Sequence, residues 1–167
     1  MQPSSNIPIQ LRSYQGLNLM AQLDINLTEA PLPIEPLSQI CTQDELTSLH
    51  ILVDASQVNS ALLEQLFVLL QGLYRPLMRG KNKQVWVIWH HSDESIIRAG
   101  AQALCQIAAL ELARKGVSIN FIHQHHALSE PQRQCLLHWQ FAHYCTAQAF
   151  SLPEAPLSQL EKLEELL

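Results

Sequence analysis

Five histidines fall where two expected strands end. His90 and His91 follow one apolar run, and His123, His125 and His126 follow the next apolar run along the chain. Open α/β sheets bind ligands outside the carboxyl ends of their parallel strands, and imidazole is a ligand for zinc and other transition metals. These five histidines are therefore candidate metal ligands. The alternative is that they are exposed loop residues, because no cysteine or carboxylate at a suitable spacing completes the set.

The residues of other common sites lack the spacing that their chemistry needs. No GxGxxG-like loop is found that would let a dinucleotide phosphate approach a helix N-terminus. The cysteines show no CxxC spacing, which favours reduced, mostly buried thiols over a metal or redox site. The four cysteines are Cys41, Cys105, Cys135 and Cys145.

Strand-like and helix-like segments alternate in the middle of the chain. The apolar runs predict strands near 49–54, 85–89 and 117–122, and the periodicity between them predicts helices over 58–79 and 95–115. Strands that alternate with helices indicate parallel pairing with right-handed crossovers. The order βαβαβ therefore predicts an α/β fold in which the histidines share one sheet edge.

The N-terminal part has a different pattern. Residues 1–29 alternate apolar and polar side chains around a turn, which predicts an antiparallel hairpin with one buried face. Residues 30–48 form a proline-rich connector with a short helix at 37–41. Thr42 and Glu45 have the spacing of a capping box, so a further helical turn is expected to begin at Thr42.

The C-terminal part, 129–167, is expected to be helical. Ser129 and Pro131 are typical of a helix start, and this helix is expected to reach about Phe150 before a last short helix.

Pro76 is expected to kink or end the helix over 58–79. The whole chain of 167 residues has the length of a single domain.

The two central helices are apolar on more sides than one sheet can cover. A helix of this kind needs a second partner, and we expect that partner to be another subunit whose matching helices complete a four-helix interface. The candidate interface residues are Leu62, Leu66, Leu69, Leu70, Leu73, Ala103, Ile107 and Leu110.

Residues 49–122 resemble the short-chain dehydrogenase/reductase family, in particular its 3-oxoacyl-carrier-protein reductases. The segments that carry the resemblance are LHILVDAS at 49–56, FVLLQGLYRPLMR at 67–79, QVWVIWHH at 84–91 and AALELARKGVSIN at 108–120. The resemblance implies a truncated Rossmann-like, three-layer fold. It also implies that the two central helices build a four-helix dimer interface, as in that family.

The resemblance fails where the family performs its chemistry. Glu94 occupies the position of the family's catalytic tyrosine, and Arg98 that of the lysine one helical turn later. Arginine does not release its proton at physiological pH. The catalytic serine position falls near Trp89 or His90, and the cofactor-side turn reads AspAlaSerGln at 54–57. We therefore expect no nucleotide cofactor and no reductase activity.

The composition argues against some classes of function. Apolar residues make up 47% of the chain, charged residues 15%, and the net charge is −5, which does not favour nucleic acid. No run of about 18 apolar residues indicates a membrane span, and the chain is expected to be cytoplasmic. The expected function is non-catalytic: dimerisation, or binding to a partner such as a related reductase. The alternative is a metal- or small-ligand-binding protein, or a divergent enzyme, that uses the histidine cluster.

Overall fold

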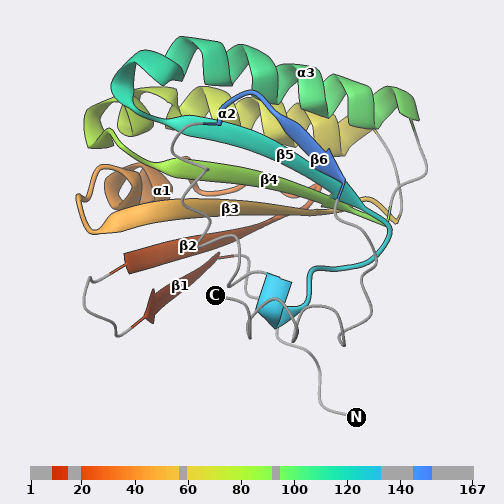
Figure 1. The fold of residues 1–167 in the computed structure, drawn as a ribbon, viewed down its shortest axis with the longest axis horizontal. Helices are drawn as coiled ribbons and strands as arrows, with labels where there is room; N and C mark the ends of the chain where they lie inside the picture. The colour runs from red at the N-terminus through yellow and green to blue at the C-terminus, as the bar shows by residue number, and fades with distance from the viewer. Residues whose placement is uncertain (1–8, 15–19, 57–59, 92–94, 133–144, 152–167) are drawn as a thin grey trace, which may run out of the picture.

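The computed structural model describes residues 9–14, 20–56, 60–91, 95–132 and 145–151, which include one mixed sheet (Figure 1). Within these ranges six strands lie in the order β1-β2-β3-β4-β5-β6. β1 is antiparallel to β2, and the later neighbours are all parallel, so β2 to β6 form a five-stranded parallel sheet. The strands are Ile9–Tyr14 (β1), Met20–Leu27 (β2), Leu46–Asp54 (β3), Gln84–His90 (β4), Ser118–Gln124 (β5) and Ala149–Ser151 (β6).

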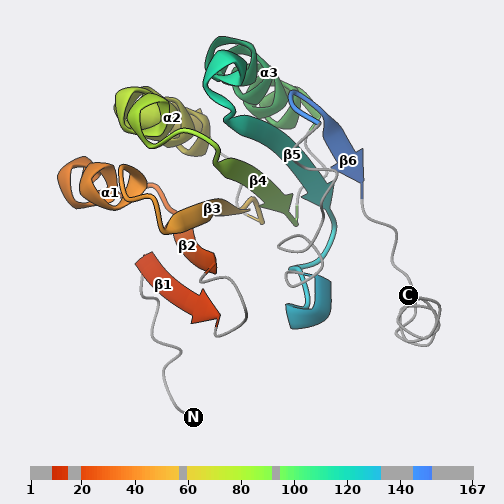
Figure 2. The same ribbon diagram turned by 60° about the vertical axis from the view of Figure 1, so that its left-hand side comes forward.

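The three longest helices of the described chain lie on the same face of this sheet (Figure 2). They are α1 (Ile34–Cys41), α2 (Ser60–Gly80) and α3 (Ser95–Leu112), and the short 3₁₀ turn Ala113–Lys115 continues α3. Strands that are neighbours in the sheet are also consecutive in the chain, so crossovers of the usual hand place successive helices on one side. The predicted α/β, truncated Rossmann-like fold with an N-terminal hairpin is confirmed.

The main core lies between the sheet and the helices. Inward-facing side chains alternate along each strand, as Leu49, Ile51 and Val53 do on β3, and all three are fully buried. Ala101, Cys105 and Leu112 of α3 are buried in this core. Apolar burial of this kind is the dominant stabilising term in folding.

The opposite face of the sheet is buried as well. Trp86, Ile88 and Ile122 form a second apolar cluster there, and the ring centroids of Trp86 and Phe150 are 6.2 Å apart. Gln22 and Asp24 are also buried on this side. The expectation that the hairpin has only one buried face is therefore wrong for β2, since its polar side is also withdrawn from water.

Hydrogen bonds make this polar burial tolerable. The Gln22 side-chain amide lies 2.9 Å from Nδ1 of His50 on β3 and also donates to Asp24. Asp24 and His50 are opposite each other in the β2–β3 register. Buried polar groups cost free energy unless they are paired, and the neighbouring strand supplies the pairing here.

The connector before β3 differs from its prediction. α1 begins at Ile34 rather than at residue 37, because Pro36 falls in the first turn, where a missing N–H costs no helical hydrogen bond. Thr42 does not begin a helix: its hydroxyl donates to the Gln39 carbonyl at 2.8 Å and closes α1. Lys83 is almost fully buried beside this turn, and its ammonium donates to the Gln43 and Leu46 carbonyls, each at 2.7 Å.

The ends of the later helices also correct the predictions. α2 does not end at Pro76 but continues to Gly80. Gly116 ends the α3 segment in the left-handed conformation (φ 70°) that glycine adopts readily. Ser129 and Gln132 exchange capping hydrogen bonds, which confirms the helix start.

The predicted extension of this last helix to Phe150 is wrong, because Ala149–Ser151 forms strand β6 beside β5. Pairing with the open edge of β5 overrides the helical pattern at these residues. The rest of that helix and the last short helix fall on 133–144 and 152–167, which lie outside the described residues.

Candidate functional site

The most exposed apolar surface lies on α2 and α3. From residue 22 onward, every large hydrophobic side chain that is exposed within the described ranges belongs to these two helices. The exposed fractions are 50% for Phe67, 46% for Val68, 80% for Ile96, 58% for Ile107 and 70% for Leu110. We call these five residues the outer face, because they point away from the sheet. A clustered apolar surface of this kind is typical of an interaction site.

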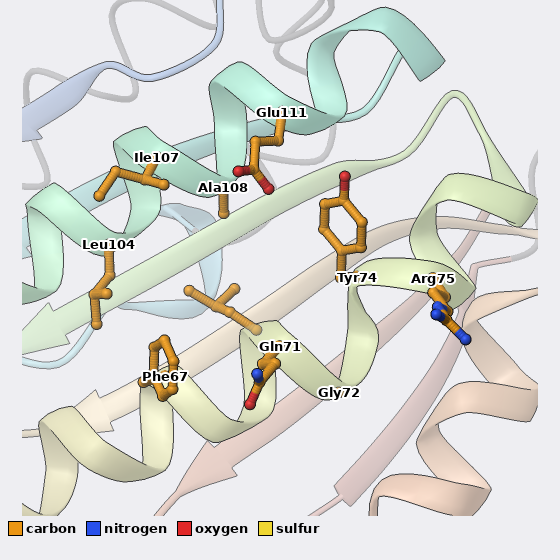
Figure 3. A pocket seen from close by; sticks show the side chains of 10 residues that line it. Phe67, Gln71, Gly72, Tyr74, Arg75, Leu104, Ile107, Ala108 and Glu111 are labelled. Atoms are coloured by element: carbon orange, nitrogen blue, oxygen red, sulfur yellow. The ribbon is translucent and has the colours of Figure 1, made fainter.

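A groove of about 540 Å³ runs between the two helices of the outer face. Figure 3 shows Phe67 on α2 opposite Leu104 on α3, with Tyr74 and Glu111 across from one another farther along. A second hollow, lined by Leu63, Glu64, Val68 and Gly100, continues the groove, because Phe67 and Leu104 line both. The groove is therefore a long, mainly apolar channel with charged residues near its ends.

Gly100 allows the two helices to approach closely. A Cβ atom at this position would lie 3.2 Å from a methyl carbon of Leu63, so a larger side chain would require Leu63 to shift by a few tenths of an ångström. The floor of the groove is thus set by a small residue on α3 and a leucine on α2. This arrangement keeps the outer face continuous across both helices.

The burial of the α2 leucines corrects the predicted interface. Five of the eight predicted contact residues belong to the core of their own chain and are at most 8% exposed, so they offer little surface to a second chain: Leu62, Leu66, Leu69, Leu70 and Leu73. Ala103, Ile107 and Leu110 are exposed, as an interface requires. Phe67 and Val68, which the prediction omitted, are the exposed large apolar side chains of α2.

The histidines lie at the predicted edge, but they do not converge. His90 ends β4 and is buried, His123 lies near the end of β5, and His125 and His126 are exposed beyond it. The rings of His90 and His91 are 5.7 Å apart. Burial lowers the pKa of His123, and the nearby charges of Arg98 and His125 lower it further. Within the described ranges, no group of three or more His, Cys, Asp or Glu side chains could hold a metal ion.

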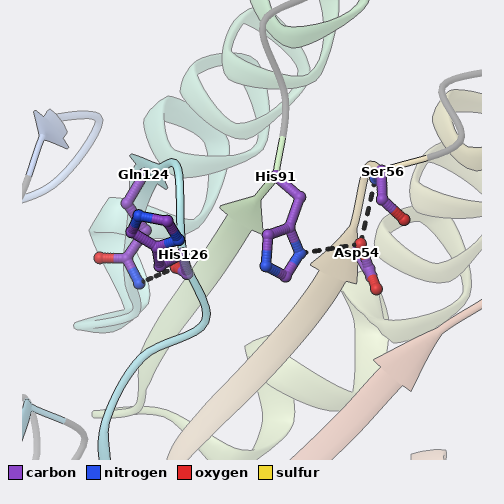
Figure 4. Close-up of polar contacts among 5 residues, drawn as sticks. All are labelled: Asp54, Ser56, His91, Gln124 and His126. Atoms are coloured by element: carbon purple, nitrogen blue, oxygen red, sulfur yellow. Dashed lines mark hydrogen bonds and ion pairs between the residues drawn. The ribbon is translucent and has the colours of Figure 1, made fainter.

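The structure instead pairs His91 with Asp54, a contact that the sequence analysis did not predict. Nδ1 of His91 lies 3.0 Å from Oδ1 of Asp54, which also accepts the Ser56 backbone N–H at 3.0 Å (Figure 4). Burial alone would raise the pKa of Asp54, but the hydrogen bonds from Ser56 and His91 outweigh it and lower that pKa. The signal was present in the sequence, since Asp54 ends one strand and His91 directly follows the next one.

A cleft of about 410 Å³ surrounds this pair at the carboxyl ends of β2, β3 and β4. We call it the edge cleft. Its polar lining comes from Asn26, Thr28, Glu29, Asp54, Ser56, His90 and His91. Its size falls in the range of small-molecule sites. The edge cleft is separate from the groove of the outer face, with which it shares no lining residue.

The segment Ile96–Lys115 is long and apolar enough to cross a membrane by length and composition alone, as one helix of the described chain. Its inner side chains, Ala101, Cys105 and Leu112, are packed on the sheet. A helix that lies in the core of a folded domain can have the same length and composition, so these two properties do not indicate a membrane span.

Comparison with known proteins adds no assignment. No protein-family model matches the chain, and no curated protein matches it.

Proposed function

We propose that this chain is a non-catalytic relative of the short-chain reductases that acts by pairing through its outer face. The simplest partner is a second copy of the chain, and a related reductase with the same two helices is the alternative partner. The observation that carries the proposal is the clustering of exposed apolar side chains on α2 and α3. Fully burying a side chain such as Phe or Leu stabilises a complex by about 1.5–3 kcal/mol, and a symmetric pair buries each residue twice.

The charges beside the groove favour a symmetric pair. Glu64 lies near one end of the exposed side of α2 and Arg75 near the other, about 16 Å apart along a helix. A two-fold axis perpendicular to α2 sets the two copies of this helix antiparallel. Glu64 of each copy then faces Arg75 of the other, while Phe67 and Val68 meet near the axis.

The positions that match the catalytic residues of the reductases carry side chains unsuited to that reaction. The serine position falls near Trp89 or His90, both of which are buried, and Trp89 packs against Phe121 with ring centroids 6.2 Å apart. Its indole has no hydroxyl that could bind or polarise a substrate carbonyl. Arg98, at the lysine position, cannot exchange a proton at neutral pH. Glu94, at the tyrosine position, lies outside the described residues.

The test is the oligomeric state of the full chain and of matched variants, measured by light scattering after size-exclusion chromatography. Ile107→Glu places a charge at the centre of the outer face, whereas Gln39→Glu adds the same charge at an exposed site on α1. The expected result is a dimer for the wild type and Gln39→Glu, and a folded monomer for Ile107→Glu. A wild-type monomer at micromolar concentration, or a dimer that persists in Ile107→Glu, would refute self-pairing through this face.

A further inference from the structure

Four cationic side chains gather at the C-terminal ends of α2 and α3. Arg79 is in the last turn of α2, Lys81 follows that helix, and Arg114 and Lys115 belong to the 3₁₀ turn that continues α3. All four are exposed. They are four of the ten lysines and arginines in a chain whose net charge is −5. We call these four residues the basic end, a region of positive charge in a chain that is acidic overall.

The two parts of the basic end belong to one surface. α2 and α3 each connect neighbouring parallel strands, so both helices end at the same edge of the sheet (Figure 2). The N–H of Asn82, one residue after Lys81, donates to the Lys115 carbonyl at 3.1 Å. A Cβ atom at Gly116 would collide with the side chain of Asn82. The loop after α2 is therefore in direct contact with the turn after α3, and the four cations lie on one part of the surface.

The charge of the basic end is not neutralised within the described ranges. None of its four side chains makes a hydrogen bond or an ion pair with another residue of those ranges. A cation in the last turn of a helix interacts favourably with the helix dipole, but this effect falls off beyond that turn, where Lys81 lies. Gathering like charges is itself unfavourable. Helix stability therefore does not account for the basic end as a whole.

The basic end adjoins exposed apolar surface. Leu110 is 70% exposed and lies one helical turn before Arg114. Protein interfaces combine apolar contacts, which supply affinity, with charged pairs at the rim, which set specificity and the rate of association. Cations without a partner next to an exposed leucine therefore indicate a binding surface for a protein that carries the opposite charge.

We propose that the basic end binds an acidic segment of a protein partner. Carboxylates accept two parallel hydrogen bonds from an arginine and form ion pairs with lysine. A short segment suits this surface better than an extended polyanion does. A nucleic acid duplex or an anionic membrane would reach past the four cations, where the rest of an acidic chain repels it. The proposal goes beyond the pairing of the outer face, because none of the four cations belongs to that face or to the Glu64–Arg75 contact.

The experiment is an NMR titration of the full chain with hexaglutamate at neutral pH and constant, low ionic strength. Saturable shifts are expected at the backbone amides of Asn82 and Gly116, where the two parts of the basic end meet. Hexalysine is expected to give no shift there. A DNA duplex and phosphatidylserine vesicles, compared at the same concentration of negative charge, are expected to bind more weakly than the peptide. No saturable shift with hexaglutamate, or equal or tighter binding of the duplex or the vesicles, would overturn the proposal.

Matched variants assign the binding to these residues. Arg79→Gln combined with Arg114→Gln removes two positive charges, and about tenfold weaker binding of hexaglutamate is expected from the loss of two exposed ion pairs. Gln39→Glu combined with Ser60→Glu changes the net charge by the same amount at exposed sites away from the basic end, so a change below about twofold is expected. Lys81→Gln, beyond the end of α2, provides the test if the first double variant disturbs the fold. Equal weakening in the two double variants, or unchanged affinity after loss of the basic-end charges, would overturn the proposal.

Discussion

Leu66 and Phe67 are consecutive residues of α2 that face opposite sides of the helix layer. Leu66 is fully buried against the sheet, whereas half of the surface of Phe67 is exposed on the outer face. On α3, Cys105 and Ile107 differ in the same way, at 1% and 58% exposed. Side chains of similar hydrophobicity thus have two roles in one layer. The inner ones hold the chain's own fold, and we propose that the outer ones hold a second chain.

The largest expected effect separates the two sides of α2 by stability. Leu66→Ala is expected to lower the free energy of unfolding by about 2–5 kcal/mol, because it leaves a cavity in a packed core. Phe67→Ala is expected to lower it by less than about 1 kcal/mol in the monomer, since half of the ring is already in water. Urea unfolding at a protein concentration below the dimer dissociation constant measures both changes. Equal losses in the two variants would contradict the division into inner and outer sides.

The positions of most strands and helices along the chain were easier to predict from the sequence than the contacts that their side chains make. Strict alternation in β2 and the mixed periodicity of α2 and α3 depend on neighbours in the chain, so these three elements could be located with errors of a few residues at their ends. The strand β6 depends on pairing with β5, and the sequence predicts a helix there. Which half of the apolar surface of α2 meets the sheet depends on the placement of the whole helix. The leucines were therefore assigned to the dimer interface, although the chain's own sheet covers them.

Polar contacts between distant segments were the least predictable. A lysine is usually exposed at the protein surface. The ammonium of Lys83 is nevertheless buried against two carbonyl groups about 40 residues earlier in the chain. The Asp54–His91 pair joins the ends of two strands that are separated by the whole of α2. Such contacts follow from the register of the parallel strands, and no local pattern encodes that register. The sequence places the histidines correctly at the sheet edge, but it does not predict that Asp54 is the partner of His91.

A smaller effect distinguishes the sides of α3 by chemical reactivity. Burial raises the pKa of the Cys105 thiol to about 12, so very little thiolate is present at pH 8. Cys105 is expected to react with iodoacetamide at least about a hundredfold more slowly in the native chain than in urea, because the native thiol reacts only after local opening. Mass spectrometry of peptides from timed samples measures this rate.

The matched comparison is Ile107→Cys, two residues farther along the same helix on the outer face. This thiol is expected to react rapidly in dilute protein and more slowly as the concentration rises, because pairing covers it. Rapid labelling of native Cys105 would show that the inner side is open. A labelling rate at residue 107 that does not depend on concentration would count against pairing through the outer face.

The smallest expected effect tests how two copies would be oriented. If α2 pairs antiparallel with its copy, Arg75→Glu places two acidic residues together at each end and is expected to weaken the dimer about fivefold, since an exposed ion pair is worth about 1 kcal/mol or less. Glu64→Arg combined with Arg75→Glu restores the opposite charges and is expected to recover most of that loss, as a sedimentation series at low salt would measure. An additive loss in the double variant would exclude the antiparallel orientation but leave the apolar pairing standing. In the proposed dimer the charges set the orientation of the two copies, whereas Phe67 and Ile107 supply the affinity, so each contribution can be lost without the other.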